Sequence, residues 1–299
     1  MSYLNNLFLT VLSFLALFLN KIRYALFGYT NPRRFSTSQI ERAIDYDIGI
    51  VNNWLHYLDL YAADKLNFKD KNILELGPGG DLGIGVIMLC EGAESYTAID
   101  VNNLIEFAPE SLYSKLFDTL SSRSIPASVI DKVKDEYSKF KQKKVSSLKF
   151  ICDELFDLSV MRNNHIDFVL SNAAFEHFTD IESVMRGLSD AVPSGCILVT
   201  EVDLSTHTRW LRDCDPLNIY RLNDTLYSLL KYSGIPNRVR PYEYMDYLKK
   251  YGWENVKCYP KTILDDNYVS SVKPHLYKKF RSDINEMQNL HVVICAIKS

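Results

Sequence analysis

The strongest constraint on the fold of this chain is the alternation of strand-like and helix-like segments that begins at residue 72. Short apolar runs that favour strands are separated by segments in which apolar residues recur at helical spacing. This alternation predicts βαβ units, and therefore a parallel sheet with helices on both of its faces. The strands are expected at residues 72–76, 96–100, 150–153, 167–171 and 196–202.

Two further strands are expected near the carboxyl terminus, at residues 256–259 and 291–297. Because they follow one another late in the chain, they favour an antiparallel hairpin at one edge of the sheet. The sequence therefore predicts an α/β fold built on a mostly parallel seven-stranded sheet. Ahead of it, apolar residues at helical spacing between Ile40 and Leu58 predict a helix that leads into this domain.

The length of 299 residues suits one large domain with additions. We expect an N-terminal apolar helix and basic linker at residues 1–35, and the main domain at residues 36–299. Within that domain, residues 104–148 and 204–245 are longer than a single crossover requires. Both follow the carboxyl ends of strands, where open α/β sheets bind ligands, so we expect them to be insertions that cap a substrate site.

Charge and cysteine usage exclude some classes of function. The chain has 34 Lys and Arg against 37 Asp and Glu, a net charge of −3, and such a balance gives no reason to expect a nucleic-acid partner. None of the 6 cysteines forms a CxxC pair, so neither a zinc site nor a redox dithiol is expected. The sequence assigns no metal-binding residues and does not indicate an oligomeric state.

The segment Glu75–Gly83, which reads ELGPGGDLG, lies between an expected strand and an expected helix. This is the context that a nucleotide-binding turn requires. Gly77 and Gly79 allow the backbone to turn sharply and to approach a ligand closely. The next strand ends in Asp100, 21 residues after Gly79, where a carboxylate can accept both hydroxyls of a ribose.

These residues resemble the class I S-adenosylmethionine-dependent methyltransferases, over about residues 70–203 and more weakly to the end. The resemblance implies a Rossmann-like fold and S-adenosyl-L-methionine as the cofactor. It further implies that the turn with Glu75, Gly77 and Gly79 holds the methionine part, that Asp100 binds the ribose, and that Asp153 lies near the adenine amine. Asp81 stands where the family motif has its third glycine.

A segment rich in polar groups follows the fourth expected strand. Asn172 should face the sulfonium of the cofactor, and the resemblance extends to the Glu176–His177 pair, which family members acting on small molecules often show. The pair could hold a substrate hydroxyl or accept its proton, because histidine titrates near neutral pH. Alternatively, His177 caps the next helix or packs beneath the cofactor. His207, after the fifth strand, competes as the base or is a solvated loop residue.

Several arginines lie in the second insertion, and they could bind phosphate or carboxylate or pair with neighbouring acids. We expect methyl transfer, with O-methylation favoured, to a small-molecule, saccharide or lipid-linked acceptor. Two alternatives remain open at this point: an NAD(P)-dependent oxidoreductase that uses the same turn, and a cofactor-binding protein without catalysis.

The run Leu7–Leu19 is uncharged and strongly apolar. As a helix of about 20 Å it is shorter than the roughly 30 Å hydrocarbon core of a membrane. Four basic residues follow it, Lys21, Arg23, Arg33 and Arg34, which favours a cytoplasmic location for the rest of the chain. We expect membrane contact through residues 3–27; the alternative is a helix that packs on the domain.

Overall fold

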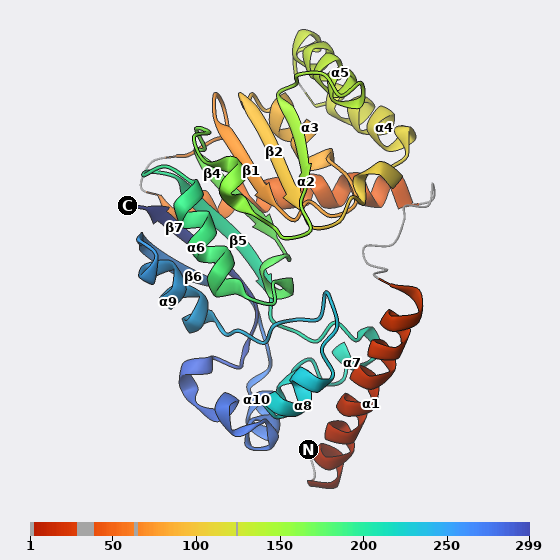
Figure 1. The fold of residues 1–299 in the computed structure, drawn as a ribbon, viewed down its shortest axis with the longest axis vertical. Helices are drawn as coiled ribbons and strands as arrows, with labels where there is room; N and C mark the ends of the chain where they lie inside the picture. The colour runs from red at the N-terminus through yellow and green to blue at the C-terminus, as the bar shows by residue number, and fades with distance from the viewer. Residues whose placement is uncertain (1–2, 29–38, 63–64, 124) are drawn as a thin grey trace.

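The computed structural model describes residues 3–28, 39–62, 65–123 and 125–299. In this part of the chain, helices cover both faces of a seven-stranded sheet, and a smaller helical region lies below one end of it (Figure 1). The strands are β1 (Asn72–Leu76), β2 (Ser95–Asp100), β3 (Leu148–Cys152), β4 (Phe168–Asn172), β5 (Ile197–Asp203), β6 (Trp253–Ile263) and β7 (Asn289–Lys298).

The strand order is β3-β2-β1-β4-β5-β7-β6. The first five strands of this order run parallel, β7 is antiparallel to β5, and β6 is antiparallel to β7. Because β1 lies between β2 and β4, the chain reverses its direction of winding beside β1, and this is the topological switch point of an open α/β sheet. The predicted Rossmann-like, mostly parallel seven-stranded sheet is confirmed.

The two carboxyl-terminal strands pair as expected, but they do not form a tight hairpin. Residues 264–288, which include α10 (Asp266–Val272), separate them, and β7 inserts between β5 and β6. The burial of β7 explains this position, since Val292 to Ala296 are all buried on both faces of the strand. A strand that is apolar on both faces belongs inside a sheet, and the more polar β6 takes the edge.

One face of the sheet is covered by α2 (Ile40–Tyr61), α3 (Gly83–Cys90), α4 (Glu110–Ser121) and α5 (Ala127–Lys141). All eight residues of α3 are buried, as befits a helix enclosed between the sheet and other helices. The other face is covered by α6 (Ile181–Ala191) and α9 (Pro241–Lys250). The first expected insertion, residues 104–148, thus contributes α4 and α5 to the main core.

The second expected insertion, residues 204–245, contains α7 (Arg209–Arg212) and α8 (Asp224–Leu229) and builds a separate small core. This core also takes in residues of α10 and of α1 (Tyr3–Phe27), so segments from both ends of the chain meet there (Figure 1). The boundaries 1–35 and 36–299 remain a prediction, because part of the linker, residues 29–38, lies outside the described residues.

The N-terminal helix is longer than the apolar run that predicted it. With 25 residues, α1 extends about 37 Å, enough by length and composition to cross a membrane. One stripe of it packs on the small core, with Asn6, Ser13 and Leu17 buried. The opposite stripe is exposed and apolar, and it consists of Leu4, Leu7, Phe8, Val11, Leu15, Phe18, Leu19, Ile22, Leu26 and Phe27.

Polar contacts fix the packed stripe of α1. The amide of Asn20 donates to Oγ1 of Thr208 over 3.2 Å, and Nζ of Lys21 donates to the Leu229 carbonyl over 2.5 Å. Of the four basic residues that follow the apolar run, Lys21 is thus bound to the end of α8. Arg33 and Arg34 lie outside the described residues. The helix is therefore both a packed element and the carrier of an exposed apolar surface.

Candidate active site

The predicted site residues gather along the edge of the sheet formed by the carboxyl ends of the parallel strands. Gly77 follows β1, Asp100 ends β2, and Asn172 ends β4 directly beside Glu201 of β5. Asp153 follows β3, and its backbone N–H donates to the Asp100 carbonyl over 2.9 Å. The ends of these strands meet because the strands are parallel, so residues far apart in the sequence share one edge.

The glycine turn adopts the conformation that its sequence predicted. Gly77 and Gly79 have φ values of +77° and +78°, the left-handed region that glycine enters without steric penalty. Gly77 also passes close to the chain after β4, since a Cβ placed on it would lie 2.6 Å from Cβ of Ala174. The turn is tied to α4 by Leu82, whose N–H donates to the Tyr113 hydroxyl over 3.1 Å.

Glu75 lies beneath this turn rather than at its surface. The residue is buried, and the Tyr96 hydroxyl donates a hydrogen bond to its carboxylate. Burial, and then the charges of Asp81 and Asp100, raise the pKa of Glu75 well above its ordinary value. Burial thus favours the protonated form of Glu75, which serves as a support for the turn.

Helix α2 brings two residues to the site that sequence analysis missed. Asp47 is 4% exposed, and its Oδ2 has no hydrogen-bond partner. This oxygen sits over the turn, because a Cβ added to Gly83 would lie 2.0 Å from it. Burial and the neighbouring Asp81 raise the pKa of Asp47. Tyr46 accepts a hydrogen bond of 3.0 Å from Nδ2 of Asn172.

A signal for Asp47 exists in the sequence. It lies between Ile44 and Ile48, on the stripe of α2 that faces the core, where a carboxylate is unexpected. A lone acid on an apolar stripe is a reason to look for a partner or a ligand.

The carboxylates of Asp100 and Asp153 have different surroundings. Asp100 Oδ1 accepts a hydrogen bond from the Asn102 N–H over 2.9 Å, and burial raises the pKa of this aspartate. Asp153 is partly exposed, and its Oδ1 accepts a hydrogen bond of 2.8 Å from the N–H of Leu155. Each carboxylate therefore keeps oxygen lone pairs for a ligand at the sheet edge.

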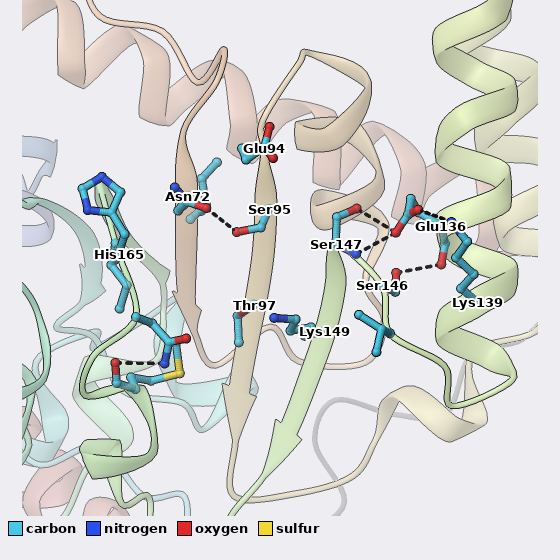
Figure 2. Close-up of a pocket in the computed structure, with 15 residues that line it drawn as sticks. Asn72, Glu94, Ser95, Thr97, Glu136, Lys139, Ser146, Ser147, Lys149 and His165 are labelled. Atoms are coloured by element: carbon cyan, nitrogen blue, oxygen red, sulfur yellow. Dashed lines mark hydrogen bonds and ion pairs between the residues drawn. The ribbon is translucent and has the colours of Figure 1, made fainter.

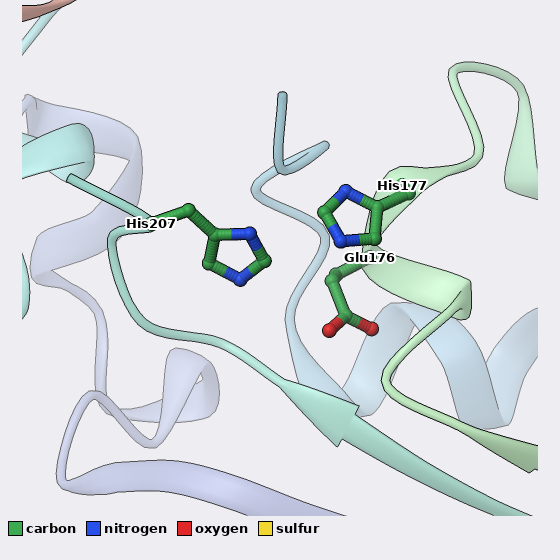
Figure 3. Close-up of side chains that lie close together, drawn as sticks. All are labelled: Glu176, His177 and His207. Atoms are coloured by element: carbon green, nitrogen blue, oxygen red, sulfur yellow. The ribbon is translucent and has the colours of Figure 1, made fainter. Parts of the chain in front are cut away.

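Three residues from two different loops form a polar cluster at the same edge (Figure 3). Glu176 and His177 belong to the single helical turn η4 (Phe175–His177) after β4, and His207 follows β5. One ligand atom of each residue lies within 4.8 Å of those of the other two. The histidine rings meet edge to face, with their centroids 4.8 Å apart.

Several polar atoms of this cluster are buried without a hydrogen-bond partner. Glu176 is 1% exposed, and neither of its carboxylate oxygens has a hydrogen-bond partner of normal geometry. Burial, and then the charge of Asp203, raise the pKa of Glu176. Nδ1 of His177 is also buried without a partner, and burial lowers the pKa of His177 to about 4. His177 is therefore a neutral imidazole at physiological pH.

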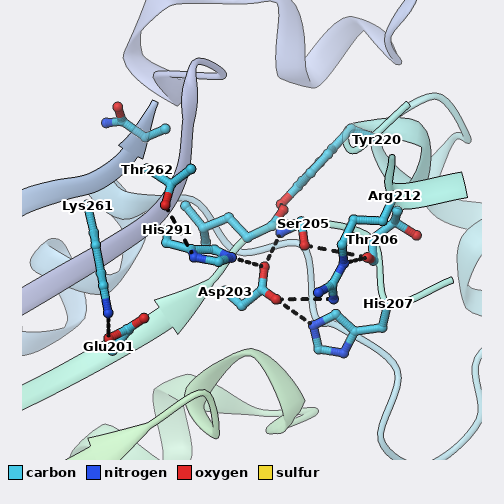
Figure 4. A network of polar contacts seen from close by, with 12 residues as sticks. Glu201, Asp203, Ser205, Thr206, His207, Arg212, Tyr220, Lys261, Thr262 and His291 are labelled. Carbon is cyan, nitrogen blue, oxygen red and sulfur yellow. Dashed lines mark hydrogen bonds and ion pairs between the residues drawn. The ribbon is translucent and has the colours of Figure 1, made fainter. Parts of the chain in front are cut away.

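Asp203, at the end of β5, organises the groups behind His207 (Figure 4). Its carboxylate lies 3.4 Å from Nε2 of His207, 3.1 Å from Nε2 of His291 and 3.2 Å from a guanidinium nitrogen of Arg212. Burial opposes ionisation of this carboxylate, but hydrogen bonds from the two histidines hold the pKa of Asp203 far below its usual range. A permanent negative charge therefore stands beside His207.

Three arginines of the second insertion support the small core. Arg221 pairs with the buried Asp215 over 2.7 Å, and Arg238 pairs with Asp224 over 2.5 Å and lies against the Tyr227 ring. Arg240 is fully buried and donates to the carbonyls of Asn285, Glu286 and Asn289. Of the two roles considered for arginines in this region, these three take the structural one.

A cavity of about 540 Å³ lies at the opposite, amino-terminal edge of the sheet, where β1, β2 and β3 begin (Figure 2). Its polar rim is held together by Glu136 of α5, which accepts hydrogen bonds from Lys139 and from the backbone of Ser147. The Lys139 bond, and then the Ser147 bond, lower the pKa of Glu136 to about 2. This cavity is remote from the glycine turn, because the cavity lies where β1 begins and the turn lies where β1 ends.

Comparison with known proteins shows which family this chain belongs to. A family model described as a methyltransferase domain matches residues 51–258, about two thirds of the chain. The match includes the carboxyl ends of β1 to β5 but not Tyr46, Asp47 or β7. A comparison with curated proteins finds no match.

Solved structures with a similar fold include three methyltransferases. The CurJ carbon methyltransferase shares 14% identity over 97% of this chain and 67% of its own, with a TM-score of 0.47. A phosphoethanolamine N-methyltransferase of Haemonchus contortus shares 13% over 90% of this chain and 59% of its own, with a TM-score of 0.47. An S-adenosylmethionine-dependent methyltransferase of Mesorhizobium loti shares 11% identity over 81% of this chain and 96% of its own, with a TM-score of 0.41. Sequence identities and TM-scores this low do not indicate which acceptor this chain methylates.

The family match decides between the alternatives that the sequence left open. It covers the glycine turn, the acid at the end of β2 and the segment after β4, the same residues that carried the resemblance. An oxidoreductase and a protein without catalysis are both set aside by this match. The chain belongs to the methyltransferase domain family, and it is a class I enzyme that uses S-adenosyl-L-methionine as its cofactor.

Proposed function

We propose that this enzyme transfers the methyl group to a hydroxyl of a small-molecule, saccharide or lipid-linked acceptor, and that it works at the cytoplasmic face of a membrane. The observation that carries the proposal is the polar cluster of Glu176, His177 and His207 beside Asn172. A hydroxyl acceptor must lose a proton, whereas an amine with a free lone pair need not, so a cluster with unpartnered nitrogen and oxygen atoms suits a hydroxyl.

The residues of the sheet edge fit the cofactor. Its methionine part carries an ammonium group, and the unpartnered, buried Oδ2 of Asp47 over the glycine turn offers a carboxyl oxygen for it. Gly77 and Gly79 would then pass under the methionine part, with Glu75 as the support beneath them. Asp100 would accept the ribose hydroxyls, and Asp153, one strand further along, would lie near the adenine amine.

The cofactor supplies an electrophilic methyl group on a sulfonium, so the protein has mainly to position the acceptor and exclude water. Asn172 would face the reacting centre, held in place by the Tyr46 hydroxyl. Between the two candidate bases, the arrangement favours His207. The fixed charge of Asp203 stabilises the imidazolium that forms when His207 takes a proton, whereas burial weakens His177 as a base.

His177 and Glu176 would bind the acceptor hydroxyl. Neutral His177 presents its unpartnered Nδ1, and Glu176 presents two unpartnered carboxyl oxygens that can accept a hydrogen bond from the hydroxyl. Both come from η4, which Asn237 of the second insertion holds by hydrogen bonds to the carbonyls of Phe175, Glu176 and Phe178. Residues 204–245 would thus close the acceptor side, as expected from the sequence. The other predicted insertion, residues 104–148, would act on the cofactor side through Tyr113.

The exposed apolar stripe of α1 supports the membrane location. Ten large apolar side chains point away from the small core, and each buried Leu or Phe side chain contributes about 1.5–3 kcal/mol when it leaves water. Because the other stripe is packed on the protein, α1 would lie along the membrane surface with the small core above it.

The experiment is methyl transfer from radiolabelled S-adenosyl-L-methionine into separated lipid and aqueous extracts of cells that lack the protein. Wild-type enzyme should label one acceptor class, and His207→Gln should slow labelling by roughly 10²–10⁴-fold without weakening S-adenosylhomocysteine binding. His165→Gln is the matched control, since that histidine is exposed near the opposite edge of the sheet. A labelled product stable to base but carrying the methyl on nitrogen or carbon would refute O-methylation.

A further inference from the structure

The cluster of Glu176, His177 and His207 has a chemical property that methyl transfer does not require. Its three groups are one carboxylate and two imidazoles, the donor set that proteins use for divalent transition metals. Sequence analysis assigned no metal ligands, because Glu176 and His207 are separated by 30 residues and meet only through the pairing of β4 with β5.

Glu176 provides the strongest sign that a cation belongs here. Both of its oxygens are enclosed and neither accepts a hydrogen bond of normal geometry, although the residue is 1% exposed. The backbone amides of Glu176 and Asp203 face the carboxylate and favour its charged form only in part. A buried carboxylate without a partner is strongly unfavourable, and a positive ion between it and the histidines would remove that penalty.

One ring nitrogen of each histidine lies within 4.8 Å of the other and of a Glu176 oxygen. Nδ1 of His177 has no partner, while the Gly234 backbone accepts from the ring and so orients it. His207 is backed by the Asp203 carboxylate at 3.4 Å, and Asp203 is itself held by His291 and Arg212. A carboxylate behind a ligating histidine fixes the orientation of the ring and increases its basicity, as in many metal sites.

Binding requires the three donor atoms to move closer together. Donor atoms of a tetrahedral ion bound at about 2.0–2.2 Å lie roughly 3.3–3.6 Å apart, so donor atoms spread over 4.8 Å must close by about 1.2–1.5 Å. His207 can make this movement, because its side chain is 25% exposed and its loop carries no strand pairing at that position.

We infer that Glu176, His177 and His207 bind a single divalent transition-metal ion such as Zn²⁺. Hard ions such as Mg²⁺ and Ca²⁺ prefer all-oxygen sites and are poorly suited. Three protein ligands leave a position of a tetrahedral ion open, the arrangement of catalytic sites. This role of the ion rests on the proposed function. The ion would bind the acceptor hydroxyl at the open position and lower its pKa, so that the proton passes to solvent water and His207 acts as a ligand instead of as the base.

The test uses full-length protein that has been stripped with a chelator and dialysed. Co²⁺ is titrated in, and its visible absorption reports coordination by nitrogen and oxygen donors; Zn²⁺ is then added to displace it. Wild-type protein should bind one equivalent per chain. Glu176→Gln, His177→Gln and His207→Gln should each weaken Co²⁺ binding by roughly 10–100-fold or more.

Two controls make the result specific. His165→Gln alters an exposed histidine, and His291→Gln alters one that contacts Asp203 but lies outside the three ligands. His165→Gln should bind Co²⁺ as the wild type does, and His291→Gln should lose less than any ligand variant. Thermal unfolding of each variant shows that it is folded.

The inference is overturned if folded wild-type protein shows no saturable Co²⁺ binding, or if Glu176→Gln binds as tightly as the wild type. S-adenosylhomocysteine affinity and methyl transfer are measured on the same samples with and without Zn²⁺. Metal binding without any O-methyl product would refute the proposed function alone, and O-methyl transfer by stripped protein without metal binding would refute the metal site alone.

Discussion

The substitution Gly77→Ala tests the cofactor turn through a single atom. At φ +77° an alanine costs about 1–2 kcal/mol relative to glycine, and its Cβ would lie 2.6 Å from Cβ of Ala174, far inside normal contact. Overpacking of this kind adds about 1–3 kcal/mol. Together the two effects should lower the free energy of unfolding by about 2–5 kcal/mol. Because the clash also displaces the turn, S-adenosylhomocysteine should bind more weakly.

The matched control is Gly195→Ala. Gly195 has φ +85° but nothing within 4 Å of an added Cβ, so it carries the same backbone strain without the clash. Thermal unfolding should place Gly77→Ala at least about 2 °C below Gly195→Ala, since 1 kcal/mol corresponds to about 2–4 °C in a domain of this size. Isothermal titration with S-adenosylhomocysteine should show weaker binding only for Gly77→Ala.

A second substitution tests whether the clash with Ala174 causes the loss of stability and affinity. Ala174→Gly removes the atom that the new Cβ would strike, so the double variant Gly77→Ala with Ala174→Gly should recover part of the lost affinity and stability beyond the sum of the single effects. If the double variant is no better than the sum of the two single variants, or if Gly77→Ala matches Gly195→Ala in both assays, the close approach of turn and β4 loop is not what shapes this site.

Three further predictions concern the cofactor, the fold and the membrane. Asp100→Ala should weaken S-adenosylhomocysteine binding by about 10–100-fold, because it removes charged hydrogen bonds of about 1.5–3 kcal/mol; unchanged affinity by titration calorimetry would contradict the ribose assignment. The pKa of Glu136 is held at about 2, below its unfolded value, so its stabilising contribution is complete above about pH 4.5 and is lost as pH falls toward 2. The melting temperature of Glu136→Gln should therefore fall less than that of the wild type over this range, and equal slopes would argue against the link between α5 and β3. Phe8→Glu with Leu19→Glu should abolish flotation with anionic vesicles and leave the melting temperature unchanged, whereas the control Leu155→Glu, at an exposed position outside α1, should leave both flotation and melting temperature unchanged. Retained flotation of the double variant would exclude the stripe as the membrane contact.

Local patterns in the sequence were sufficient to predict the sheet and the edge of it that carries the glycine turn. The alternation after residue 72 predicted every parallel strand to within a few residues, and the glycine turn followed from the φ values that only glycine adopts readily. Both depend on neighbours within one segment, where side-chain periodicity and backbone freedom decide the structure. The uncharged run Leu7–Leu19, taken alone, is shorter than α1 because it is only the central part of the helix, which spans Tyr3–Phe27.

Only the tertiary structure decided which polar groups meet. Asp47 reaches the glycine turn because α2 packs across α3, and Asp203 meets His291 because β7 inserts beside β5. The cluster of Glu176 with His207 likewise depends on the register of β4 against β5. Sequence spacing carries no information on such contacts, since they arise from the path of the chain between elements and from the burial of groups that would otherwise remain in water.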